Sequence, residues 1–165
     1  MNDKKLSVYL ETSVISYLTS KPSQNIVTLA NQQVTRQWWE KERNLYDLFI
    51  SGSVLDEISQ GDAKASSSRL EKVKEIKVLS IDNQVQELSN LFIESRLIPP
   101  KSYEDALHLS YTIVQKIDIL LTWNCKHLAN LEILRMLQNI CNPLNLTLPD
   151  ICTPYMLTKR GKRND

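Results

Sequence analysis

Three carboxylates lie where apolar segments of the chain begin or end. Glu11 follows a short apolar run, Glu57 lies in a short amphipathic segment, and Asp105 opens an apolar, helix-like segment. A fourth polar residue, Asn124, directly follows another apolar run. An acid next to a buried segment costs folding free energy unless something compensates it. A divalent cation would compensate all of them, because hard cations take oxygen ligands. The spacing therefore favours a metal-dependent active site.

Each acid also has a simpler explanation when it is considered alone. Glu11 could interact with the dipole of a following helix. Ser102 and Asp105 have the spacing of a capping box, in which the acid satisfies a backbone donor. His108 lies three residues after Asp105, so it could orient that acid or face the same cleft, although a structural role is more common. Glu57 could lie on a solvated helix face. The joint placement of the acids, rather than any single one, carries the hypothesis.

Strand-like and helix-like segments alternate along the chain. Apolar strand candidates cover residues 7–10, 48–50, 77–81, 119–122 and, more weakly, 151–152. Helical spacing is found at 13–18, through 27–38, around Glu57, from Asp62, from Asp82, from Ser102 and over 131–140. Strands separated by helices imply crossovers and a parallel sheet that is covered on both faces. We therefore expect a three-layer α/β/α fold with four to five parallel strands.

The predicted sheet also predicts where a ligand would bind. In open α/β sheets, ligands bind beyond the carboxyl ends of the strands, near the point where the strand order reverses. Glu11 and Asn124 both follow strand candidates directly, so they belong to that edge. Only one of the neighbouring acids Asp56 and Glu57 can point inward from its helix. Placement and chemistry therefore agree.

Length, charge and cysteine usage narrow the class of protein. A chain of 165 residues has the size of one domain, and no apolar stretch approaches the roughly 20 residues of a membrane helix. The net charge of +1 gives no global attraction for nucleic acid, although a local basic patch would not show in the sum. The three cysteines suit no framework of paired bridges, and the N-terminus lacks an export signal. We expect a cytoplasmic protein without a membrane partner, folded as a single domain over 1–165 with a flexible basic tail at 158–165.

Other kinds of site are less well supported. The cysteines and histidines show neither a C-x-x-C nor an H-x-x-x-H spacing, which makes a zinc site improbable. With three glycines the chain can form no Gly-rich phosphate loop. The pair Trp38–Trp39 could stack on bases, but on an amphipathic helix the core or a dimer contact is the better interpretation.

Four segments of the chain together resemble the motifs of the PIN domain family, in particular VapC-type toxin ribonucleases. The resemblance extends over nearly the whole chain, and its motifs lie at 8–18, 54–58, 104–109 and 120–127. It aligns Glu57, rather than Asp56, with the second acidic motif. The chain departs from the family at Glu11, where Asp is usual, and at Asn124, where an acid is usual.

The resemblance implies a small ribonuclease that hydrolyses RNA, often as the toxin of a type II toxin–antitoxin pair, with Mg²⁺ or Mn²⁺ as cofactor. It also implies an antitoxin partner and a homodimer. In this hypothesis Glu11 and Asp105 bind the metal, and Glu57 is a ligand or positions water. Asn124 would orient a ligand or water. The supporting hydrogen bonds would come from residues near these acids, namely Thr12, Ser13, Thr122 and His108.

Two alternatives remain open at this stage. The substitutions at Glu11 and Asn124 could leave a catalytically weakened PIN-like module that binds RNA or a partner protein. A different α/β hydrolase, such as a phosphatase, is less well supported because Glu11-Thr12-Ser13 lacks the expected D-x-D pattern.

Overall fold

The computed structural model, which describes residues 4–158, contains one parallel sheet of five short strands. The strands are β1 (Ser7–Leu10), β2 (Asp47–Ser51), β3 (Lys77–Leu79), β4 (Ile119–Leu121) and β5 (Asp150–Cys152). Their order in the sheet is β3-β2-β1-β4-β5, with every neighbouring pair parallel. The chain therefore builds the sheet outward from β1 in one direction and then in the other, so the strand order reverses between β1 and β4.

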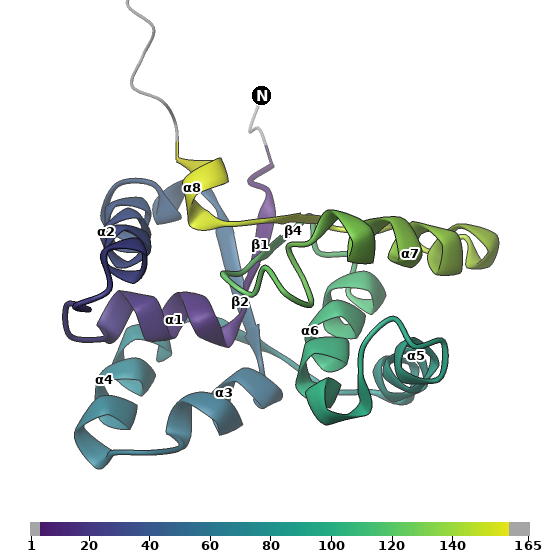
Figure 1. Cartoon of the computed structure of the whole chain (residues 1–165), viewed down its shortest axis with the longest axis horizontal. Coiled ribbons are helices and arrows are strands. Elements are labelled where there is room, and N and C mark those ends of the chain that lie inside the picture. The colour runs from purple at the N-terminus through teal and green to yellow at the C-terminus, as the bar shows by residue number, and fades with distance from the viewer. Residues whose placement is uncertain (1–3, 159–165) are drawn as a thin grey trace, which may run out of the picture.

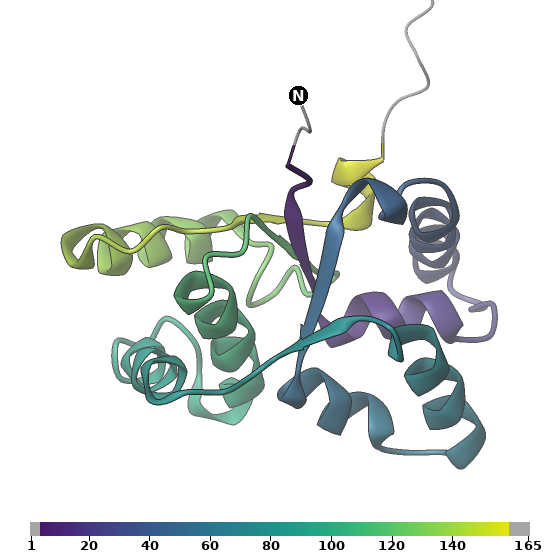
Figure 2. The same cartoon turned by 180° about the vertical axis from the view of Figure 1, so that it is seen from behind.

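Helices cover both faces of this sheet, which confirms the predicted three-layer fold. The helices are α1 (Thr12–Thr19), α2 (Ile26–Lys41), α3 (Gly52–Ser59), α4 (Ala63–Val73), α5 (Asn83–Glu94), α6 (Tyr103–Val114), α7 (Leu131–Cys141) and α8 (Pro154–Leu157). In Figures 1 and 2, α1, α2 and α4 lie on one side of the strands and α5, α6 and α7 lie on the other. Of the predicted tail 158–165, all but Thr158 lies outside the described residues.

Side-chain caps at the amino ends of the helices explain where many of them begin. Asn25, Asp62 and Asp82 each accept hydrogen bonds from backbone N–H groups in the first turn of the helix that follows. Ser51, at the end of β2, does the same for α3. These caps satisfy N–H groups that have no partner within the helix, which lets the chain turn directly from strand to helix.

The central strands are the most deeply buried part of the chain. Val8, Tyr9 and Leu10 of β1 are fully buried, and the residues of β4 are almost as inaccessible. At the amino ends of β1 and β4, the Asp118 carboxylate accepts hydrogen bonds from Ser7 N at 2.8 Å and Ser7 Oγ at 2.6 Å. This contact fixes the register of β1 against β4, the two strands whose far ends carry the site.

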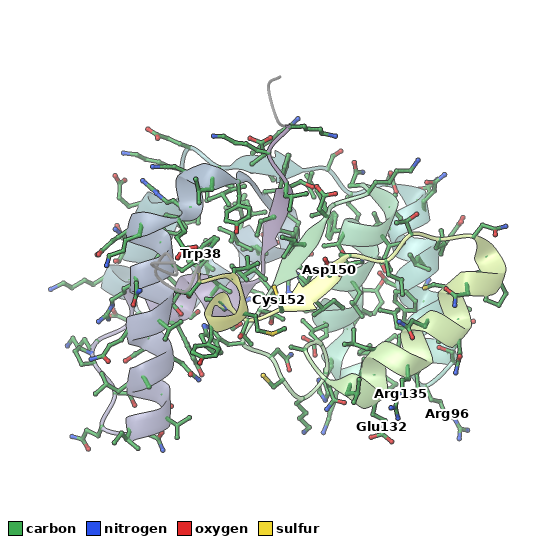
Figure 3. The ribbon with its side chains drawn as sticks, turned by 90° about the horizontal axis from the view of Figure 1, so that it is seen from above. Trp38, Arg96, Glu132, Arg135, Asp150 and Cys152 are labelled. Carbon is green, nitrogen blue, oxygen red and sulfur yellow. The ribbon has the colours of Figure 1, made fainter. Side chains whose placement is uncertain are left out.

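Trp38 and Trp39 lie in the core, which was one of the two interpretations that the sequence favoured. The predicted apolar stripe is not the buried face of α2, because Val27 is 65% exposed and the buried residues besides the tryptophans are Gln32 and Thr35. Trp38 is fully buried and Trp39 is 5% exposed. Figure 3 shows Trp38 on α2, with Asp150 and Cys152 along the edge strand β5. No helix among residues 4–158 is long and apolar enough to cross a membrane.

Candidate active site

The candidate site lies beyond the carboxyl ends of β1 and β4, where the strand order reverses. The backbone N–H of Glu11 donates to the carbonyl of Leu121 at 3.0 Å, so the first residue after β1 is joined to the end of β4. The segment 122–130 continues from that point and wraps over the same edge. This is the position at which a doubly wound sheet offers a binding crevice.

Glu11 is buried and is held by two hydroxyl groups. Its Oε2 accepts from Thr122 Oγ1 at 2.7 Å and from Ser13 Oγ, and its Oε1 accepts from Ser13 N at 3.1 Å. The same two hydroxyl oxygens accept from the backbone N–H groups of Trp123 and Asn124, both at 2.9 Å. Each hydroxyl therefore donates its one proton to Glu11, while its oxygen accepts a hydrogen bond from the backbone of the loop after β4.

Glu57 points inward from α3, whereas its neighbour Asp56 is exposed. Its Oε1 accepts from Thr12 Oγ1 at 2.7 Å and lies 3.0 Å from His108 Nε2. Burial acts to raise the pKa of Glu57, but the hydrogen bond and charge of His108, together with the Thr12 hydroxyl, outweigh it and lower the pKa below its ordinary value. The structure thus places Thr12 between the first two acids, since it follows Glu11 and contacts Glu57.

His108 is almost fully buried and lies among the three acids. Burial acts to lower the pKa of His108, but the hydrogen bond to Glu57 raises it. The negative charges of Glu11, Glu57 and Asp105 raise the pKa further, so that it lies above the ordinary value of a histidine. Glu57 contacts the ring directly, and Glu11 and Asp105 lie near enough for their charges to act on it. The helical spacing allowed His108 either to orient Asp105 or to face the same cleft, and its hydrogen bond is to Glu57.

Asp105 is held by the loop that follows β4. Its Oδ1 accepts from Asn124 Nδ2 at 2.9 Å, and its Oδ2 lies 2.7 Å from His127 Nδ1. The Oδ1 of Asn124 accepts from the backbone N–H groups of Lys126 and His127. The capping-box alternative for Asp105 is wrong, because the side chain of Ser102 makes no capping hydrogen bond at the start of α6.

Three residues near the acids were not assigned to the site from the sequence. His127 contacts Asp105, Tyr9 contacts His108, and Glu104 lies near Glu57. Desolvation raises the pKa of Glu104, and the negative charge of Glu57 raises it further. Tyr9 could have been found from strand alternation, because it precedes Glu11 by two residues and so points in a similar direction. His127 and Glu104 lie within the motifs at 120–127 and 104–109, and this was the available signal.

Protein groups compensate the three acids without a cation, which corrects the reasoning from burial. Hydroxyls hold Glu11, an amide and an imidazole hold Asp105, and a hydroxyl and an imidazole hold Glu57. Among residues 4–158, no three Asp, Glu, His or Cys side chains are grouped closely enough to hold one metal ion as they stand. The donor set of carboxylates and hydroxyls nevertheless has the chemistry that Mg²⁺ and Mn²⁺ prefer. The cysteines are elsewhere: Cys141 and Cys152 are buried and Cys125 is exposed.

Comparison with solved structures identifies the fold. The chain is similar to VapC20 of Mycobacterium tuberculosis, a toxin that cleaves the sarcin–ricin loop, with a TM-score of 0.53, 13% identity, and coverage of 73% of this chain and 92% of that one. It is also similar to a chain of VapBC2 from Rickettsia felis, a complex bound to a DNA fragment from its promoter (TM-score 0.58, 15% identity, 90% and 98% covered).

A third similar structure is VapBC-1 from nontypeable Haemophilus influenzae (TM-score 0.55, 12% identity, 91% of this chain and 99% of that one covered). No protein-family model matches the sequence, and no curated protein matches it. At these identities the likeness establishes the fold. The chain has the PIN-domain fold of VapC toxins, as the resemblance of its four motifs predicts.

Proposed function

We propose that the protein is a divalent-metal-dependent endoribonuclease that hydrolyses RNA phosphodiester bonds. The observation that carries this proposal is that hydrogen bonds link Glu11, Glu57 and Asp105 at the switch point of the sheet. Thr12, which follows Glu11, donates to Glu57. Asn124, which binds the Thr122 hydroxyl that holds Glu11, donates to Asp105. These three carboxylates would repel the phosphates of RNA unless a cation lay between the acids and the phosphate. Two like charges 4 Å apart cost about 4 kcal/mol at an effective dielectric constant near 20. The similarity to VapC20, a toxin that cleaves the sarcin–ricin loop, supports this activity.

In this proposal Glu11, Glu57 and Asp105 hold Mg²⁺ or Mn²⁺. The bound ion supplies an activated water and neutralises charge on the scissile phosphate. The protein's own residues fix the ligands: Ser13 and Thr122 hold Glu11, and Thr12 holds Glu57.

The loop after β4 completes the arrangement. Asn124 and His127 hold Asp105 between them, so that both of its oxygens are oriented before an ion arrives. Lys126 lies exposed within the same loop and carries a positive charge. We assign it to contact with the phosphates of the RNA.

Cleavage assays with metal exchange test the proposed activity. Purified protein should cleave RNA with Mn²⁺ or Mg²⁺ and lose cleavage with EDTA. Asp105→Asn should reduce the rate by about 10²-fold or more while the protein stays folded, since it removes a charged ligand. Asp56→Asn is the matched control, because Asp56 neighbours Glu57 but is exposed. A wild-type protein that cleaves no RNA with any divalent ion would overturn the proposal.

A second candidate function rests on the position of Asn124. Its amide nitrogen donates to Asp105, so this position contributes a hydrogen bond where an acid would contribute negative charge. A weakly charged site favours a PIN-like module that binds RNA or a partner without cutting it. RNA binding that survives Asp105→Asn, without cleavage by the wild type, would favour this alternative.

We further propose that the protein acts as the toxin of a type II pair, in the cytoplasm, as a homodimer restrained by an antitoxin. The similarity to the VapBC2 and VapBC-1 complexes supports this assignment. A short upstream reading frame for a DNA-binding protein is expected beside the gene. Expression of this chain alone should arrest growth, and co-expression of the neighbour should relieve the arrest. Analytical ultracentrifugation tests the dimer.

A further inference from the structure

A buried chain of hydrogen bonds reaches the candidate site from the interior of the sheet. Ser51 Oγ lies 2.7 Å from Tyr9 Oη, which lies 2.7 Å from His108 Nδ1. His108 Nε2 then lies 3.0 Å from Glu57 Oε1. Ser51 and Tyr9 are fully inaccessible and His108 is 1% exposed, so water cannot replace these contacts. We propose that His108 is a positioning residue, held by Tyr9 and Ser51, that directs the carboxylate of Glu57 into the site. This inference rests on the proposed nuclease function.

The donors and acceptors in the chain leave one possible direction for the contact with Glu57. An ionised carboxylate only accepts hydrogen bonds, so the proton between His108 and Glu57 belongs to Nε2. Both the neutral Nε2–H ring and the imidazolium carry that proton. The hydroxyl of Tyr9 suits either ring, because it can donate to Nδ1 or accept from it. The hydrogen bond from Nε2 to Glu57 can therefore form with the neutral ring and with the imidazolium.

Ser51 connects this series of hydrogen bonds to the backbone of α3. Its Oγ accepts from Val54 N at 3.3 Å, which caps the helix α3 that carries Glu57. The same hydroxyl therefore fixes the start of α3 and the hydroxyl of Tyr9. Glu57 is thus positioned twice, through its own helix and through His108, and both routes begin at the end of β2.

The consequence for Glu57 is that its two oxygens differ. Oε1 accepts from both Thr12 Oγ1 and His108 Nε2, whereas none of the hydrogen bonds among residues 4–158 reaches Oε2. The side chain of Glu57 is 30% exposed, in contrast to the buried ring that holds it. Oε2 is therefore the oxygen that can bind a cation or a water. The two oxygens of a carboxylate are chemically equivalent, so what the His108 ring fixes is the orientation of the carboxylate plane. That orientation decides where the remaining oxygen points.

Two substitutions at one position separate positioning from packing. His108→Gln can place an amide N–H where Nε2–H lies, and so retains the donor to Glu57. His108→Asn can place an amide oxygen near Nδ1, and so retains the acceptor for Tyr9 but loses the donor to Glu57. Tyr9→Phe removes the support behind the ring. Ser89→Ala is the control, because it removes a buried hydrogen bond to Ser110 of α6 without touching the chain to Glu57.

The first readout is Mn²⁺ affinity, measured by electron paramagnetic resonance of the free ion in the absence of RNA. Loss of an outer partner of a ligand lowers metal affinity about 10- to 100-fold. We expect that loss for His108→Asn, a smaller loss for Tyr9→Phe, and affinity within about threefold of wild type for His108→Gln and Ser89→Ala. Cleavage by His108→Asn should recover at high Mn²⁺. Wild-type affinity in folded His108→Asn, or equal losses in the Asn and Gln variants, would overturn the proposal.

The second readout does not require nuclease activity. Long-range ¹H–¹⁵N correlation spectra of the imidazole should show a proton on Nε2 of His108. The Nε2 signal should move in Glu57→Gln, and the Nδ1 signal should move in Tyr9→Phe. A ring protonated only at Nδ1 contradicts the positioning role. If the wild type neither binds Mn²⁺ nor cleaves RNA while these shifts are observed, the nuclease function fails and the contact itself stands.

Discussion

At the scale of residues, hydroxyl groups account for most of the stabilisation of Glu11. Ser13 and Thr122 each donate to its carboxylate and each accept a backbone N–H from the loop after β4. A hydrogen bond to a charged group is worth more than one between neutral groups, and a buried group left without its partner costs more still. These two side chains therefore couple the charge of the site to the conformation of the loop.

Thr122→Val should destabilise the protein by about 1–3 kcal/mol, because it leaves a buried carboxylate oxygen and the N–H of Asn124 short of a partner. Urea denaturation in EDTA measures the change. Thr19→Val is the comparison, since the hydroxyl of Thr19 bonds only within its own helix. An equal and small change in both variants would show that the Thr122 hydroxyl is dispensable.

The pair His108 and Glu57 should give the stability a definite pH dependence in the absence of metal. The pKa of His108 is raised in the folded protein. The contribution of His108 to the free energy of unfolding is therefore fully present below pH about 6.5, the ordinary pKa of histidine, and is lost as the pH rises through the raised pKa. The pKa of Glu57 is lowered in the folded protein. The contribution of Glu57 to the free energy of unfolding is therefore present above the ordinary pKa of a glutamate and is lost as the pH falls through the lowered pKa.

The unfolding free energy should therefore be highest in mildly acidic solution and fall toward alkaline pH. His108→Gln removes the titrating ring and should abolish the fall across neutral pH. Urea denaturation between pH 4 and pH 9 in EDTA provides the test. The same slope in wild type and variant would show that the ring does not gain a proton on folding.

At the scale of elements, the strands were predictable because they are short, apolar and separated by helices. The strand predicted at 7–10 has those bounds, and the other four differ from their predicted bounds by at most two residues. Helix ends were harder to place: α2 extends to Lys41, beyond the apolar stripe that ends at Trp38. The contacts of Glu57 with His108 and of Asp105 with His127 could not be predicted. They span 51 and 22 residues, so they depend on how the crossovers pack rather than on local spacing.

The turn after β4 offers a prediction at this scale. Asn124→Asp retains the acceptor for the turn but replaces the donor to Asp105 with a second negative charge. In EDTA the variant should lose about 1–3 kcal/mol of stability. Mn²⁺ should then raise its melting temperature more than it raises that of wild type, because the extra carboxylate adds a ligand.

Thermal unfolding with and without Mn²⁺ measures both effects. Asn90→Asp serves as the control, since Asn90 is exposed on α5. If Asn124→Asp is as stable as wild type in EDTA, the hydrogen bond between Asn124 and Asp105 contributes little.

At the scale of the whole molecule, the order of the strands decides which distant residues meet. Glu11 follows β1 and Thr122 follows β4, 111 residues later, yet their side chains lie 2.7 Å apart because β4 is inserted beside β1. The same arrangement pairs the edge strand β5 with β4, and Ile151 and Cys152 of β5 are buried. The accessibility of the cysteines is therefore a test of the fold.

Under native conditions, iodoacetamide should modify Cys125 and spare the other two cysteines. Burial raises the pKa of Cys141 to about 11 and that of Cys152 to about 12, so neither forms the reactive thiolate near neutral pH. Peptide mass spectrometry before and after unfolding in urea measures the three rates. Labelling of Cys152 as fast as Cys125 in the native protein would contradict the packing of β5.

The hydroxyls, amide and imidazoles that surround the acids have a consequence for the stability of the protein without a metal ion. A protein whose ligands repel one another when empty must load its ion to stay folded, as small zinc modules do. Here each acid already has partners from the chain. For the proposed metal-dependent nuclease, a chelator should therefore stop cleavage without unfolding the protein, and added Mg²⁺ or Mn²⁺ should restore cleavage.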